Sequence, residues 1–251
     1  MIEFRHVSAG YNGTCVLKDI SLSIPKGSLT ALIGPNGCGK TTLLRAAVGQ
    51  LPLQSGQILL DSRPITAYGR KEFARNVAFM PQVRSIPAIS VQALVSHGRF
   101  PYLGLSRQMR SEDRKAVQKA MENAGVSEWA HRDLRTLSGG ERQRVYIAMA
   151  LAQDTDVIFL DEPTTYLDLG HQFELLELIQ SLQQQGKTIV MVLHDLSHAL
   201  RYSSRILLMD QGCVISCGTP QEIYESGALT QVFHVQAHQA ANNYYFTPKT
   251  K

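Results

Sequence analysis

A glycine-rich segment near the N-terminus has the residue types and the spacing of a phosphate-binding loop, the pattern G-x-x-x-x-G-K-[ST]. Its residues are Gly34, Pro35, Asn36, Gly37, Cys38, Gly39, Lys40 and Thr41, followed by Thr42. Glycines let consecutive backbone N–H groups curl around phosphate oxygens, and the N-terminus of the following helix adds its positive dipole end. The ammonium group of Lys40 would then reach the β and γ phosphates, and Thr41 would ligate Mg²⁺. Nucleotide kinases, GTPases and transport ATPases all need such a loop.

A second segment places two carboxylates at the end of a buried strand. Residues 157–160 are apolar, and Asp161 and Glu162 follow them. A strand end beside the phosphate loop is where a Mg²⁺ ligand belongs, so we expect Asp161 on the metal side. Glu162 points the other way and is placed to polarise a water molecule for attack on the γ-phosphate. The alternative is a solvent-facing acidic turn before Pro163.

A third segment, Leu137 to Glu141, opens a helix with a serine and two glycines. Ser138, Gly139 and Gly140 supply a hydroxyl and unencumbered N–H groups at a helix N-terminus, which predicts a second anion site. Ser138 also fits a helix N-cap, with Glu141 three residues on as its capping-box partner. Both interpretations can hold at once.

The elements that must position these residues follow from apolar periodicity. Period-two alternation over residues 2–7 and again through Leu22 and Ile24 predicts antiparallel strands. Further strands are expected at 29–33, 157–160, 189–193, 206–209 and 214–216, and helices at 41–48, 141–151, 169–185 and 196–202. Residues 83–137 show helical spacing without a convincing strand, so we interpret them as a helical insert. The tail, 235–247, predicts a hairpin with Asn242 and Asn243 in its turn.

This alternation of strands and helices implies an α/β fold with a mostly parallel sheet covered on both faces. An antiparallel β subdomain would stand at the N-terminus. We expect one cassette, with a nucleotide-binding core of residues 1–82 and 138–234. The helical subdomain, 83–137, would interrupt this core, and residues 235–251 would form a C-terminal tail.

Composition excludes several classes of function. The 251 residues are 44% hydrophobic and 18% charged, which is ordinary for a globular chain. The net charge of +4 is small and scattered, so nucleic acid is a poor first partner. No apolar stretch approaches the roughly 18 residues that span a bilayer, and the N-terminus lacks a signal pattern. The four cysteines form no C-x-x-C pair, which suits reduced thiols in the cytoplasm, and we assign no metal to His234 and His238.

The three segments together resemble the ATP-binding subunits of ABC transporters, in the order of that family and over nearly the full chain. Residues 34–41 resemble the Walker A loop, 137–141 the signature, 157–162 the Walker B strand and 167–168 the D-loop. Three single residues match further family positions: Tyr11 the aromatic A-loop residue that stacks on adenine, Gln82 the Q-loop glutamine and His194 the switch histidine. Glu141 departs from the pattern, since glutamine is more frequent there.

The resemblance implies a head-to-tail pair of identical cassettes that sandwich two ATP molecules with Mg²⁺. Lys40 of one copy and Ser138 of the other would grip the same γ-phosphate, and Asp168 would link the two sites. His194 would contact that phosphate, and Gln82 would sense Mg²⁺ and the water. The helical insert would dock a polytopic membrane permease, which would hold the chain at the inner face of the membrane.

The segment Gly98 to Tyr102 and the run Glu162 to Gln172 are similar to cassettes of importers for ferric siderophores, haem and cobalamin. Such importers use a separate extracytoplasmic binding protein, and ferric siderophore is the favoured substrate. Haem or a corrinoid is the alternative. A soluble ABC ATPase without a transport role is the competing class, but such proteins usually carry tandem cassettes or long coiled-coil inserts. A hypothesis concerning Cys38 is that its alkylation would block ATP by steric bulk.

Overall fold

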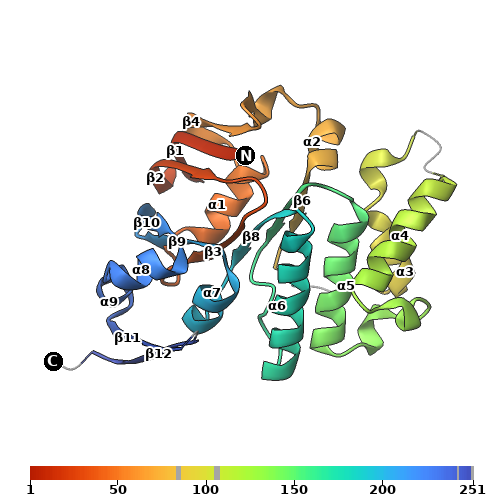
Figure 1. Cartoon of the computed structure of the whole chain (residues 1–251). Coiled ribbons are helices and arrows are strands. Elements are labelled where there is room, and N and C mark those ends of the chain that lie inside the picture. Colours follow the sequence, from red (N-terminus) through yellow and green to blue (C-terminus); the bar gives the residue numbers. More distant parts are fainter. Residues whose placement is uncertain (83–85, 105–107, 242, 250–251) are drawn as a thin grey trace. The chain divides into compact units, whose positions relative to one another are not determined.

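The computed structural model describes residues 1–82, 86–104, 108–241 and 243–249 (Figure 1). The chain divides into two compact units. The first unit comprises residues 1–67 and 183–251, and the second comprises residues 68–182. Parts of two expectations lie outside the described residues: 83–85 and 105–107 of the helical insert, and residues 242, 250 and 251 of the tail.

The first unit begins with an antiparallel sheet in the order β2-β1-β4-β5. Its strands are β1 (Ile2–Tyr11), β2 (Thr14–Ile24), β4 (Leu53–Leu60) and β5 (Arg63–Pro64). Ile2 pairs with Ile24 on one side and with Leu60 on the other, so the alternating apolar residues share one buried face. The predicted antiparallel start is therefore confirmed.

Strand β4 is absent from the sequence-based expectations. Only its last three residues, Ile58 to Leu60, are buried, so the strand lacks a long alternating pattern. Gly56, with φ of 80°, crosses β1 so closely that a Cβ atom would lie 2.2 Å from the carbonyl oxygen of His6. His6 itself has φ of 52° at an irregular point of the pairing. A bulge of this kind breaks the period-two signal on both strands.

A second group of strands in the first unit has the order β10-β9-β3-β8. These strands are β3 (Leu29–Ile33), β8 (Thr188–Val192), β9 (Arg205–Asp210) and β10 (Cys213–Gly218). Strand β3 runs parallel to β8 and to β9, and β10 returns antiparallel to β9. Every residue of β3 and β8 is buried, as expected for central strands of a parallel sheet.

The remaining elements of the first unit are short. They are the helices α1 (Lys40–Ala47), α7 (Leu196–Tyr202), α8 (Pro220–Glu225) and α9 (Ala228–Phe233), the 3-10 turn η1 (Ile65–Ala67), and the strands β11 (Val235–Ala240) and β12 (Asn243–Pro248). Strands β11 and β12 pair antiparallel, as the tail pattern predicts.

The turn of this hairpin lies one residue earlier than predicted. Asn243 already belongs to β12 and pairs with Ala240, so Asn243 is not a turn residue. Residue 242, the other predicted turn residue, lies outside the described residues. Ala241 takes the left-handed conformation, with φ of 52°. The expectation placed Asn242 and Asn243 in the turn, and asparagine tolerates the left-handed conformation better than alanine does. Cross-strand pairing overrides this preference here.

The second unit contains two parallel strands, β6 (Val77–Met80) and β7 (Val157–Leu160), and a group of helices. The helices are α2 (Arg70–Asn76), α3 (Val91–His97), α4 (Ser111–Asn123), α5 (Gly139–Ala152) and α6 (Leu169–Gln184), whose last two residues fall in the first unit, with the 3-10 turns η2 (Phe100–Tyr102), η3 (Ser127–Trp129) and η4 (Leu134–Thr136). In Figure 1, α3 and α4 lie beside α5. The predicted α/β fold, with mostly parallel central strands and an antiparallel N-terminal sheet, is confirmed.

The segment Gly98 to Tyr102 joins three helices of the second unit. The buried guanidinium of Arg99 forms an ion pair with Asp113 of α4 at 3.0 Å and donates to the carbonyl of Ala152 in α5 at 3.0 Å. It also stacks on the ring of Tyr102, 3.7 Å from the centroid. A Cβ atom on Gly98 would lie 2.2 Å from the carbonyl oxygen of Met149. This segment therefore has a packing role within the unit.

Candidate functional site

The glycine-rich loop connects β3 to α1 in the first unit, as the sequence predicts. Gly34 leaves the strand where a Cβ atom would lie 2.2 Å from the carbonyl oxygen of Met209, so a side chain has no room. Gly39 precedes the helix with φ of 107°, a conformation that side chains rarely adopt. The first turn of α1 has no acidic residue and no side-chain cap. Its N–H groups and dipole therefore suit an anion such as a phosphate group.

Lys40 lies inside this loop. Its ammonium group donates hydrogen bonds to the carbonyl oxygens of Gly34 at 2.7 Å and Pro35 at 2.9 Å, and the residue is only 6% exposed. A buried cation beside backbone N–H groups gives the loop a positive field, which favours polyphosphate. Thr41 and Thr42 follow Lys40 in the same helical turn.

Cys38 is the buried residue of the loop, and the structure bears on the alkylation hypothesis. The thiol is almost fully covered, and burial raises its pKa above the ordinary value of a cysteine. Because the thiolate is the nucleophile, a buried thiol with a raised pKa reacts slowly with a maleimide. Alkylation of Cys38 in the folded protein is therefore disfavoured, whatever its effect on ATP would be.

The turn between β9 and β10 contacts the phosphate loop, and the sequence analysis did not predict this contact. The N–H of Gly212 donates to the carbonyl of Cys38 at 3.1 Å, and the carbonyl of Gly212 accepts from the N–H of Lys18 at 2.9 Å. A Cβ atom on Gly212 would lie 2.0 Å from the carbonyl oxygen of Val16. The sequence of a hairpin turn with a glycine does not indicate which distant segment the turn contacts, so only the tertiary fold identifies this contact.

Two further predicted site residues lie in the first unit. Tyr11 ends β1, is partly exposed, and its hydroxyl lies 3.5 Å from the guanidinium of Arg45 in α1. His194 follows β8 and is exposed, and its neighbour Asp195 caps α7 by accepting the N–H of His198 at 2.8 Å. His194 lies where a loop leaves a parallel strand, which is where functional residues gather in such sheets, whereas Tyr11 lies at the end of an antiparallel strand.

The second unit brings three predicted residues to the end of β7. Asp161 is 2% exposed, and its N–H donates to the carbonyl of Met80 at 2.9 Å. Glu162 takes the left-handed conformation, with φ of 53°. Its Oε2 atom accepts hydrogen bonds from the side-chain amide of Gln82 at 2.9 Å and from the hydroxyl of Thr165 at 3.1 Å. Gln82 and Glu162, which are 80 residues apart, therefore meet directly.

The glutamate conformation is informative because bulky residues rarely have positive φ. Backbone strain of this kind persists where surrounding contacts hold it, and it concentrates at functional sites. The two side-chain donors, Gln82 and Thr165, supply those contacts for Glu162. Thr165 was not among the predicted site residues, and its position three residues after the glutamate is the signal that could have identified it.

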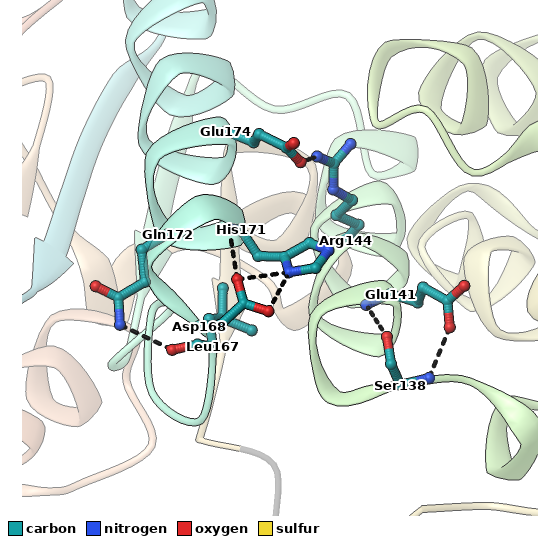
Figure 2. A network of polar contacts seen from close by, with 8 residues as sticks. All are labelled: Ser138, Glu141, Arg144, Leu167, Asp168, His171, Gln172 and Glu174. Atoms are coloured by element: carbon teal, nitrogen blue, oxygen red, sulfur yellow. Dashed lines mark hydrogen bonds and ion pairs between the residues drawn. The ribbon is translucent and has the colours of Figure 1, made fainter.

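Ser138 caps α5 as the capping-box interpretation predicts (Figure 2). Its hydroxyl accepts the N–H of Glu141 at 3.2 Å, and its own N–H donates to the Glu141 carboxylate at 2.6 Å. This backbone hydrogen bond holds the pKa of Glu141 below its usual range. The guanidinium of Arg132 lies 3.7 Å from the same carboxylate. The less frequent glutamate at this position thus completes the cap.

Asp168 precedes α6 and lies beside the signature segment in Figure 2. Its carboxylate accepts the N–H of His171 at 2.9 Å and contacts Nδ1 of the same histidine at 2.8 Å. The backbone hydrogen bond and then the side-chain bond lower the pKa of Asp168. Two large apolar neighbours project outward, Tyr166 at 85% exposure and Leu169 at 63%.

The residues predicted for Mg²⁺ have suitable chemistry. Thr41, Asp161 and Gln82 offer hydroxyl, carboxylate and amide oxygens, the ligand types that Mg²⁺ prefers. Within the described part of the chain, no group of three histidine, cysteine or acidic side chains is arranged to hold a metal by itself. Mg²⁺ in nucleotide sites is bound by few protein groups together with phosphate oxygens, so this donor set fits the ion.

Comparisons with known proteins identify the class. Residues 17–165 match the family described as ABC transporter. The chain is 44% identical to the iron(3+)-hydroxamate import ATP-binding protein FhuC of Bacillus subtilis (strain 168), covering 94% of this chain and 88% of that protein. It is 41% identical to the petrobactin import ATP-binding protein FpuD of Bacillus anthracis, covering 98% and 91%. The chain therefore belongs to the ABC transporter family, and it is an ATPase of that family.

A solved structure adds a likeness in three dimensions. The dimeric structure of MJ0796, a bacterial ABC transporter cassette, matches with a TM-score of 0.77 and 27% identity, over 88% of this chain and 99% of that one. Cassettes of this family are thus known to form dimers. Among the helices of the described residues, none has the length and apolar character that a bilayer crossing requires.

Proposed function

We propose that this chain powers the uptake of ferric siderophores, as the ATP-hydrolysing subunit of an ABC importer. The observation that carries the proposal is its 44% and 41% identity to ATP-binding proteins named for import of iron(3+)-hydroxamate and of petrobactin, over most of each protein. A separate membrane permease would carry the substrate. An extracytoplasmic binding protein would deliver it, so the siderophore itself would never touch this chain.

Nucleotide binding would begin at the glycine-rich loop. The phosphates would take hydrogen bonds from the N–H groups of the loop and of the first turn of α1, and Lys40 would exchange carbonyl partners for phosphate oxygens. Tyr11 would stack on the adenine ring. Thr41, Asp161 and Gln82 would hold Mg²⁺, whose chemistry is to neutralise the charge that develops on the phosphates.

Hydrolysis would depend on Glu162 as the group that polarises the attacking water. The bonds from Gln82 and Thr165 fix the orientation of its carboxylate before any substrate binds. Preorganisation of this kind removes the need to reorient a catalytic group during the reaction. His194 would contact the γ-phosphate and hold the geometry of the attack.

Two copies of the chain would close on ATP head to tail. The signature segment, with Ser138, Gly139 and Gly140 at the start of α5, would face the γ-phosphate bound by the partner. Glu141 would act through its bond to the Ser138 N–H. Asp168 would lie at the same edge, and the exposed Tyr166 and Leu169 support a surface that a partner covers. The MJ0796 dimer supports this arrangement by analogy.

Coupling to transport would pass through the helical segment of residues 83–137. The helices α3 and α4 and three 3-10 turns make up its described part, and they pack on α5, which starts with the signature segment. Movement of α5 on closure would therefore reach these helices. Docked on the permease, the chain would lie at the inner face of the cell membrane.

The test is the full chain assembled with a siderophore-type permease in proteoliposomes. We expect uptake of a ferric hydroxamate that requires ATP, and Glu162→Gln should bind ATP normally while turnover falls by about 10²–10⁴-fold. Gln184→Ala, a change at an exposed residue at the far end of α6, serves as a control with unchanged turnover. Transport of haem or a corrinoid instead would contradict the substrate, and copurification with ribosomes or DNA would contradict the transport role.

A further inference from the structure

His171 lies between the two segments that would face a partner subunit. It occupies the first turn of α6, three residues after Asp168. Its Nδ1 atom lies 2.8 Å from both carboxylate oxygens of Asp168, and its backbone N–H donates to one of them at 2.9 Å. A carboxylate only accepts, so Nδ1 must carry the proton. A helix cap requires the backbone bond alone, and the ring adds a second attachment.

The other side of the imidazole ring packs against the signature segment. A Cβ atom on Gly140 would lie 3.1 Å from Cγ and 3.2 Å from Cδ2 of His171, so the ring covers the position where a side chain would be. One residue earlier, a Cβ atom on Gly139 would lie 3.4 Å from the carbonyl oxygen of Tyr166. The two glycines of the signature therefore lie against residues on either side of Asp168 in the sequence.

The charges around the ring complete the arrangement (Figure 2). Asp168 bonds to the ring, and Glu141 lies in the first turn of α5, the helix that the ring faces. The pair of Arg144 and Glu174 joins the same two helices one turn further on. The Asp168 and His171 side chains remain 69% and 43% exposed, so this chain leaves them accessible to a second copy.

We propose that His171 is a positioning residue that fixes Asp168 against Gly140. The signature segment and the D-loop then meet the partner subunit as one preassembled surface. The inference rests on the proposed function, because it assumes the ATP-dependent pair. Without the ring bond, the His171 backbone N–H alone would hold the Asp168 carboxylate through one oxygen. Ordering the second oxygen at the interface would then weaken association.

The side-chain geometry provides a matched set of variants. The amide nitrogen of asparagine can occupy nearly the position of Nδ1, whereas that of glutamine reaches the position of Nε2. His171→Asn therefore keeps the donor to Asp168, while His171→Gln and His171→Ala remove it. All three keep the backbone cap. Glu174→Gln is the control, because it breaks the neighbouring ion pair on the same helix and does not touch Asp168.

The experiment measures ATP-dependent dimerisation of the full chain by sedimentation, in a Glu162→Gln background that slows hydrolysis. We expect His171→Ala and His171→Gln to weaken dimerisation by at least about tenfold, the scale of one hydrogen bond to a charged group. His171→Asn should recover most of this loss, and Glu174→Gln should match the parent. ATP binding to the monomer and Tm should stay unchanged in all four.

Equal dimerisation of the parent and His171→Ala would overturn the inference. Equal losses in all three histidine variants, with a lowered Tm, would also overturn it, because they would indicate a structural role only. Failure of the Glu162→Gln parent itself to dimerise with ATP would instead contradict the proposed pair, and the inference would fall with it. The parent sample thus separates the two failures.

Discussion

The phosphate loop, residues 34–41, and the signature segment, residues 137–141, both contain glycines at the start of a helix, but different contacts stabilise their conformations. The signature segment and the neighbouring Asp168 are called the signature edge below. Contacts to main-chain carbonyls fix the phosphate loop: Gly34 lies against Met209, Cys38 accepts from Gly212, and the Lys40 side chain bonds to loop carbonyls. The signature edge depends on side chains, namely the cap of Ser138 with Glu141 and the pair of Asp168 with His171. Cys38 and Lys40 of the first are buried, whereas the side chains of Asp168 and His171 in the second are exposed and can adapt to a partner.

The largest expected effect is at Lys40. Lys40→Ala removes the buried cation of the loop, so we expect ATP affinity of the monomer to fall by about 100-fold, the upper range for a hydrogen bond to a charged group. Binding of a fluorescent ATP analogue to the full chain measures this. The signature edge should be unaffected, and Ser138→Ala should bind ATP like the parent as a monomer. A similar loss of ATP affinity in Lys40→Ala and Ser138→Ala would contradict the expectation that only the phosphate loop binds ATP in the monomer.

The next effect concerns the turn behind the loop. A methyl group at Gly212 meets the carbonyl of Val16, so Gly212→Ala should lower the free energy of unfolding by about 2 kcal/mol and also weaken ATP binding. Gly186 is the matched control, because it also has positive φ but nothing surrounds it. Gly186→Ala should lose only about 1 kcal/mol, with ATP affinity intact. Urea unfolding with a nucleotide titration checks both, and equal ATP affinities would rule out a supporting role for the turn.

A smaller effect is expected from the cap of α5. Ser138→Ala removes the acceptor for the Glu141 N–H and should lower the free energy of unfolding by about 1 kcal/mol. Ser138→Asn restores a capping acceptor and should recover most of that stability. Thermal unfolding of the two variants measures the contribution of the cap to stability. Turnover in the assembled transporter measures any contact of the hydroxyl with ATP, because turnover would stay low in Ser138→Asn if the hydroxyl itself binds ATP.

The smallest effect is a pH dependence at Glu141. Its pKa is lowered in the folded chain because the Ser138 N–H bonds to the carboxylate. The stability it contributes is therefore complete above its unfolded pKa of about 4.3 and is lost as pH falls through the lower folded pKa. Glu141→Gln should remove roughly 0.5 kcal/mol of that acid-induced loss. Urea unfolding at pH 6 and pH 3.5 measures the loss of the free energy of unfolding on acidification. The same loss in the parent and in Glu141→Gln would refute the predicted role of Glu141.

The sequence predicts much of this fold because the relevant signals are local. Buried strands such as β3 and β8 show unbroken apolar runs, and Gly34 to Thr41 has a spacing that few other structures need. The predicted cap of Ser138 with Glu141 is confirmed for the same reason, since its partners are three residues apart.

The missed features depend on distant parts of the chain. Strand β4 is hidden by a bulge that only its neighbour β1 reveals, and Gly212 supports a loop that is far away in sequence. The contact of His171 with Gly140 joins two helices. Alternation and spacing describe one element at a time, so contacts between elements stay invisible to them.

The carbonyl oxygens that receive the Lys40 ammonium have a consequence for the working cycle. A lysine with internal acceptors does not repel its own loop, so we expect the loop to keep its curvature through product release. ATP therefore enters a template that is already shaped, and its first task is to replace two oxygen contacts of one side chain. Exchange of ADP for ATP then needs no refolding of the phosphate loop.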